Sequence, residues 1–61
     1  MMKEEKTIQE IFEQKYPPKK LVRNPLLCAE AIGYLKAVTF YFPQEKEWAE
    51  ISMSMLTLLI L

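Results

Sequence analysis

The strongest constraint on the fold is the concentration of apolar residues in the second half of a short chain. Of its 61 residues, positions 26–61 include 23 apolar residues among 36, whereas positions 1–25 include 8 among 25. A chain of this length buries only about 60% of the surface that its unfolded form exposes. One small domain over residues 1–61 therefore leaves apolar surface for another chain to cover, and we expect a homodimer or higher oligomer.

The composition also argues against catalysis and against stabilisation by a metal or a disulfide. The chain has no His and no Asp, and its single Cys28 has no partner for an internal disulfide. General-base and transition-metal chemistry depend heavily on those missing residue types. We therefore expect no enzyme, no metal site and no cofactor, and we interpret Cys28 as a small buried apolar residue. Eight basic and eight acidic residues leave no net charge to draw the chain to nucleic acid.

Neither end of the sequence carries a targeting or membrane signal. Residues 1–6 are mostly charged and no apolar stretch of a signal peptide follows them. The apolar run 26–42 contains the charged residues Glu30 and Lys36, and the apolar run 51–61 is too short to span a bilayer. We expect a cytoplasmic protein without a membrane span, which suits an unpaired cysteine. The apolar end 58–61 leaves open an alternative, an oligomerisation domain cut from a longer protein.

The N-terminal third predicts one short amphipathic helix and a linker. Thr7 and Glu10 have the spacing of a capping box, and the following apolar residues share one face, so we expect a helix over 7–16. Those apolar residues are Ile8, Ile11 and Phe12. Pro17 and Pro18 stop this helix and predict an extended linker over 17–24.

Two longer apolar helices are predicted to follow. Asn24 is a favourable N-cap and Pro25 a favourable first residue for a helix over 25–42, whose apolar character nearly all round is typical of a buried helix. A second helix is predicted over 44–60. Its apolar face consists of Trp48, Ile51, Met55, Leu58 and Leu59.

The predicted fold class is all-α. It is a three-helix domain with a short amphipathic helix, a basic Pro-rich linker and a two-helix apolar hairpin, completed by dimerisation. An α+β alternative stays open, in which residues 35–42 and 51–60 pair as a C-terminal β-hairpin, since both segments contain strand formers or alternate with period two. The strongly helix-forming segment 44–50 makes a poor tight turn and favours helices.

Small residues four apart mark a candidate interface on the helix over 25–42. Ala29, Gly33 and Ala37 lie roughly opposite its bulky residues and would let another backbone approach closely. The aromatic residues of this region suit either an interface or the core. The candidate dimer or protein interface comprises Ala29, Gly33, Ala37, Phe40, Trp48, Met55 and Leu59.

A basic cluster gives a second functional hypothesis. Lys15, Lys19, Lys20 and Arg23 fall within nine residues that contain no acidic residue. They are a possible contact for an anion or nucleic acid, or simply a solvated linker. We predict a small non-catalytic interaction or regulatory module that self-associates and docks on a protein partner. The alternative is a small nucleic-acid-binding regulator that uses the 15–23 segment.

Overall fold

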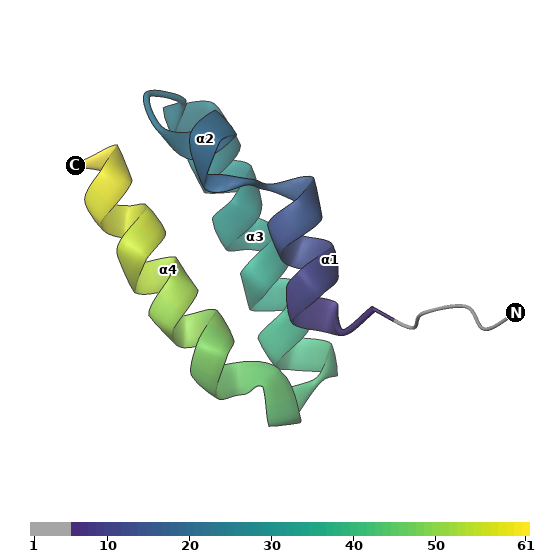
Figure 1. Ribbon diagram of the computed structural model, residues 1–61. Coiled ribbons are helices and arrows are strands. Elements are labelled where there is room, and N and C mark those ends of the chain that lie inside the picture. Colours follow the sequence, from purple (N-terminus) through teal and green to yellow (C-terminus); the bar gives the residue numbers. More distant parts are fainter. Residues whose placement is uncertain (1–5) are drawn as a thin grey trace, which may run out of the picture.

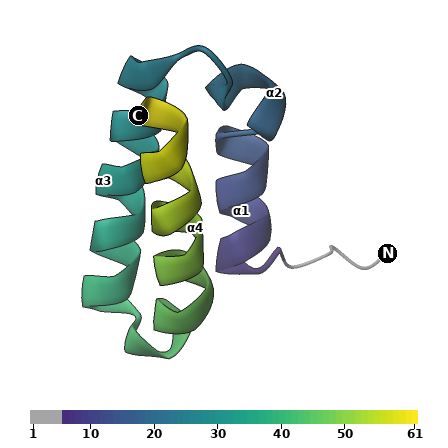
Figure 2. The ribbon, with the colours of Figure 1, turned by 90° about the vertical axis from the view of Figure 1, so that its left-hand side faces the viewer.

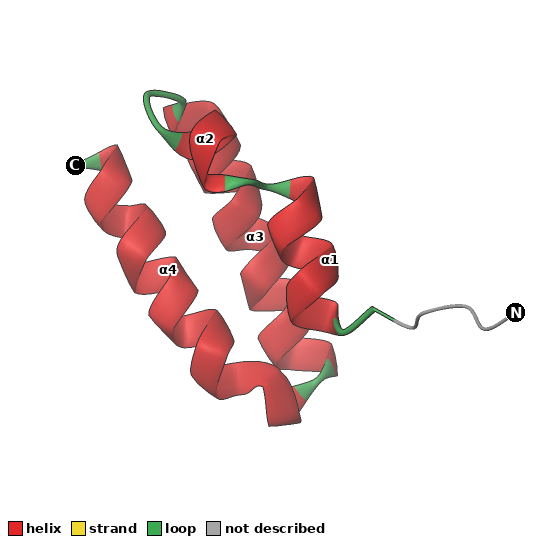
Figure 3. Cartoon of the chain, in the orientation of Figure 1, coloured by secondary structure: helices red, strands yellow, loops and turns green. Residues whose placement is uncertain are grey.

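The computed structural model describes residues 6–61, and every regular element in that range is a helix (Figures 1 and 3). The elements are α1 (Ile8–Lys15), α2 (Pro18–Leu21), α3 (Pro25–Tyr41), the 3-10 turn η1 (Pro43–Glu45) and α4 (Lys46–Ile60). The all-α prediction is confirmed. The β-hairpin alternative over 35–60 is wrong, because η1 and α4 continue the helix-forming segment that the hairpin needed as a turn.

Helix α1 begins at the predicted capping box. The backbone N–H of Glu10 donates to Thr7 Oγ1 at 3.1 Å, and the N–H of Thr7 donates to Glu10 Oε1 at 3.0 Å. The buried side of α1 consists of Phe12 and, just beyond the helix, Tyr16, which are 6% and 7% exposed. Ile11, which the sequence put on the inward face, is 43% exposed because these two aromatic rings four residues apart set the orientation of α1.

The backbone of the linker is extended at Pro17 and Val22, but it is helical over Pro18–Leu21 and left-handed at Arg23, so the expectation of an extended segment over 17–24 is wrong. Pro18 begins the single turn α2, at a position where its missing N–H costs no hydrogen bond. Buried Leu21 holds α2 against the core, and its carbonyl oxygen accepts a hydrogen bond from Cys28 Sγ at 3.3 Å. Arg23 then reverses the chain with a left-handed φ of 64°.

Helices α3 and α4 form an antiparallel hairpin, and α4 lies in front of the space between α1 and α3 in Figure 2. Asn24 caps α3 as predicted, its Oδ1 accepting from the N–H of Leu27 at 3.2 Å. The hairpin contributes most of the central cluster of buried residues. These are Cys28, Ala31 and Leu35 from α3 and Ala49 and Leu56 from α4.

Two expectations about buried faces are wrong. Helix α4 packs through fully buried Ala49 and through Leu56, whereas Ile51, Met55 and Leu58 of its predicted apolar face are 58%, 62% and 71% exposed. Helix α3 is not buried all round either, because α1 and α4 cover only one side of it. Small Ala49 lets α4 approach closely through a face that bulky residues would hold apart. The fold therefore leaves apolar surface on both α3 and α4.

Candidate protein-binding surfaces

Four of the seven predicted interface residues lie together on one side of α3. Ala29, Gly33, Ala37 and Phe40 are exposed, and Leu26 extends the same side toward the start of the helix. We call these five residues the α3 outer face. Leu26 and Phe40 are 84% and 77% exposed, which is unusual for such large apolar side chains. A Cβ atom added to Gly33 would meet nothing within 4 Å, so the chain itself makes no use of the space that this glycine leaves.

Trp48, the fifth predicted residue, lies in a different place. It is half-buried in an aromatic cluster that joins α1 to the hairpin, with its ring centroid 5.9 Å from that of Phe12. The ring centroid of Phe12 in turn lies 5.9 Å from that of Tyr34, and the ring centroid of Tyr34 lies 5.7 Å from that of Tyr16. The indole N–H of Trp48 donates to Glu45 Oε1. Trp48 thus belongs to the internal packing of the three helices and not to the α3 outer face.

Met55 and Leu59, the last two predicted residues, line an apolar groove between α4 and the α1–α2 segment. The groove has a volume of about 390 Å³, and we call it the α4 groove. Buried Leu21 and Leu56 are part of its lining, while Met55 and Leu59 remain 62% and 50% exposed. Its other lining residues are Phe12, Glu13, Tyr16, Pro18, Val22 and Ser52. No local sequence pattern indicates this groove, because three separate elements build it.

The four basic residues lie along α1, α2 and the turn that follows. Lys15 Nζ lies 5.9 Å from the centroid of the Tyr34 ring, a distance at which a cation is attracted to an aromatic face. Lys19 and Lys20 are exposed on the single turn α2, and Arg23 is exposed in the turn before α3. The basic cluster is therefore divided between the last residue of α1, the single turn α2 and a reverse turn, and neither of the longer helices α3 and α4 carries any of it.

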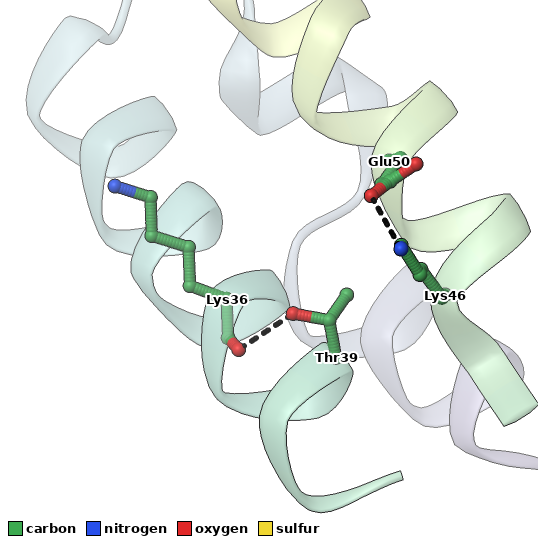
Figure 4. A network of polar contacts seen from close by, with 4 residues as sticks. All are labelled: Lys36, Thr39, Lys46 and Glu50. Carbon is green, nitrogen blue, oxygen red and sulfur yellow. Dashed lines mark hydrogen bonds and ion pairs between the residues drawn. The ribbon is translucent and has the colours of Figure 1, made fainter. Parts of the chain in front are cut away.

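The remaining polar contacts near the hairpin are surface contacts. Figure 4 shows Thr39 Oγ1 donating to the carbonyl oxygen of Lys36 at 2.8 Å and Lys46 Nζ lying 3.9 Å from Glu50 Oε2. Both residues of the ion pair are largely exposed, so the pair contributes little stability. The Lys36 side chain in Figure 4 extends away from α4. These contacts assemble no catalytic arrangement.

Residues suited to chemistry are scattered or buried in the described part of the chain. Cys28 is 1% exposed and its sulfur is engaged with the Leu21 carbonyl. Within residues 6–61 no three His, Cys, Asp or Glu side chains gather closely enough to hold a metal ion. Over the same residues, none of the helices has the length and apolar character needed to cross a membrane.

Comparisons with protein families, curated proteins and solved structures found no match to this chain. The two exposed apolar surfaces, the α3 outer face and the α4 groove, are therefore the features on which a functional argument rests.

Proposed function

We propose that this chain is a small non-catalytic protein-interaction module, which self-associates through an apolar helix face and docks on a protein partner. The observation that carries the proposal is the amount of large apolar surface left open on α3 and α4. Large contiguous apolar patches on soluble proteins mark interaction sites, because each exposed side chain forgoes the free energy of burial. Twelve large hydrophobic residues in the described chain are exposed, from Ile11 to Leu61.

The α4 groove has the form of a docking site for a partner's helix. Its floor is formed by buried Leu21 and Leu56, and exposed Met55 and Leu59 stand along one side. An amphipathic helix that lays its apolar residues into such a groove buries them without a change in the host fold. Methionine suits this role because its unbranched side chain adapts to different partners.

The alternative of nucleic-acid binding has less support. Recognition helices that read a groove present a row of side chains along several turns, and α2 has only four residues. The longer α3 is too apolar for a phosphate backbone, with Lys36 its only basic residue. The buried, unpaired thiol of Cys28 fits a reducing compartment such as the cytoplasm, with either class of partner.

Molar mass in solution tests the self-association half of the proposal. Light scattering on a sizing column over a tenfold dilution should give at least twice the 7.2 kDa of one chain at the higher concentrations. A second measurement at high salt should leave that mass unchanged, because burial of apolar surface is not screened by salt. A mass of 7.2 kDa throughout would refute self-association.

Site-specific photo-crosslinking in the source cells tests docking at the α4 groove. A photo-reactive amino acid in place of Met55 should give a defined adduct with one protein, because the side chain stands at the groove and is exposed. The matched control replaces Glu50, which is exposed on another face of α4. Adducts that form equally at both positions, or at neither, would contradict a docking site in the groove.

A further inference from the structure

The α3 outer face is directed straight away from the rest of the molecule. At about 100° of rotation per residue, its five members lie within about 40° of Gly33 around the helix axis. Ala31 and Leu35 lie on the opposite side of α3 and are 0% exposed, which places the core there. Helices α1 and α4 lie on the same side of α3 in Figure 2. Leu26 and Phe40, on the other side of α3, remain exposed to solvent.

Gly33 lies midway along this exposed face and has no role inside the chain. It is the only glycine of the sequence, and glycine in a helix interior costs about 1 kcal/mol relative to alanine. Its φ is not positive, and an added Cβ would meet no atom of the chain. Neither backbone geometry nor internal packing accounts for it, so its small size matters only if something outside the chain approaches α3 there.

Two charged residues flank the face and indicate what approaches. Glu30 and Lys36 lie about 60° to either side of Gly33 around the helix, three residues before it and three residues after it. Both are exposed, and neither makes an ion pair with another residue in the described part of the chain. One edge of the face is therefore acidic and the other basic, a distribution that is complementary to a second copy of itself in one orientation.

We propose that two copies of the chain pair through their α3 outer faces in parallel, crossing at Gly33, with Glu30 of each copy beside Lys36 of the other. This inference rests on the self-association of the proposed function and specifies its geometry. A twofold axis along the helix direction brings the acidic edge of one copy against the basic edge of the other on both sides. In an antiparallel pair, Glu30 of one copy would lie on the same edge as Glu30 of the other, and Lys36 would lie on the same edge as Lys36. Both edges would then bring like charges together.

The apolar residues of the face favour the same arrangement. Ala29, Gly33 and Ala37 form a row four residues apart, and two such rows pack at a right-handed crossing angle of about −40° to −50°. This sense of crossing also tilts Glu30 and the opposing Lys36 toward each other along the helix axis. Leu26 and Phe40 lie beyond the row at its two ends and add apolar contact on either side of the crossing.

Charge reversal tests the pairing. The variants E30K and K36E each place like charges together on both edges, so each should weaken self-association about tenfold. A one-to-one mixture of the two variants should form a heterodimer about as tight as the wild-type dimer, because each edge again joins a carboxylate to an ammonium group. Sedimentation equilibrium on differently tagged copies measures all three affinities. E50K is the matched control, since it makes the same substitution on α4 and should leave the dimer unchanged.

The outcomes separate this inference from the proposed function. If E30K self-associates as tightly as wild type while M55K does not, the dimer forms through the α4 groove, and the α3 pairing is refuted although self-association stands. In an antiparallel α3 pair, E30K would also dimerise as tightly as wild type. The substitution would replace two facing carboxylates with two facing ammonium groups, so the edge would carry like charges before and after the change. If the wild-type chain stays monomeric, both self-association and the pairing fail. Far-UV circular dichroism should show unchanged helix content in E30K, whose side chain is exposed.

Discussion

Replacing Gly33 with alanine should stabilise the folded monomer by about 1 kcal/mol, which is the difference in helix propensity between the two residues. Gly33 lies in the middle of α3, so the full interior value applies. The added methyl group would meet no atom within 4 Å, and the backbone at Gly33 is not in the left-handed region. Neither a steric clash nor backbone strain therefore offsets the gain.

Thermal unfolding followed by circular dichroism measures this gain. For a domain of this size, 1 kcal/mol corresponds to a rise in Tm of about 4–8 °C. The protein should be dilute enough for light scattering to give the mass of one chain. The control is Ala37→Gly on the same exposed face, which should lower Tm by a similar amount. An unchanged or lower Tm in Gly33→Ala would refute the conclusion that Gly33 has no role inside the folded monomer.

The same substitution should have the opposite effect on self-association. The new methyl group stands where the two α3 helices cross, so it should weaken the dimer while it stabilises each monomer. Gly33→Ala should therefore change the stability of the monomer and the affinity of the dimer in opposite directions. A variant that both unfolds at a higher temperature and dimerises as tightly as wild type would contradict a close crossing at Gly33.

Two further predictions concern the turn between α2 and α3. Asn24→Ala should lower the free energy of unfolding by about 1 kcal/mol in urea titrations, because the N–H of Leu27 loses its acceptor. Asn24→Asp retains an acceptor oxygen and should lower the free energy of unfolding much less. Arg23→Gly should raise the free energy of unfolding by up to about 1 kcal/mol, because a left-handed residue other than glycine is strained and glycine's extra chain entropy offsets only part of the relief. Arg23→Ala keeps the Cβ atom and should give no such gain, and equal effects of the two Arg23 variants would show that strain is not the cause.

The elements that local signals specify could be predicted from the sequence. The capping box at Thr7, the cap at Asn24 and the helix-forming segment after Pro43 each depend on residues within one turn of each other. Their hydrogen bonds and backbone angles involve only neighbouring residues and need no tertiary contact. This is why the all-α class followed from the sequence, although both of its long helices also contain strand formers.

The orientation of each helix could not be predicted in the same way. An apolar helix such as α3 offers several faces for packing, and the choice depends on which residues the neighbouring helices bring. Helix α4 packs through Ala49, whose small side chain carries little weight in a hydrophobic pattern but allows close approach. The sequence pattern therefore favours the larger apolar stripe of α4 as its inward face, whereas four of the five residues of that stripe, Ile51, Met55, Leu58 and Leu59, are exposed. Among the candidate interface residues, Trp48 was misplaced in the same way, because its partner Phe12 is far away in the sequence.

The aromatic cluster divides the molecule into two parts of unequal cohesion. Helix α1 reaches the core only through Phe12 and adjoining Tyr16, whereas the α3–α4 hairpin contributes five of the eight residues of the buried cluster. Helices attached by so few contacts open as separate units well before global unfolding. Amide protons of α1 should therefore exchange with solvent faster than those at the centre of the hairpin. Trp48 lies beside Phe12 where the two parts meet and is the only tryptophan of the sequence, so its emission should report whether α1 is in place.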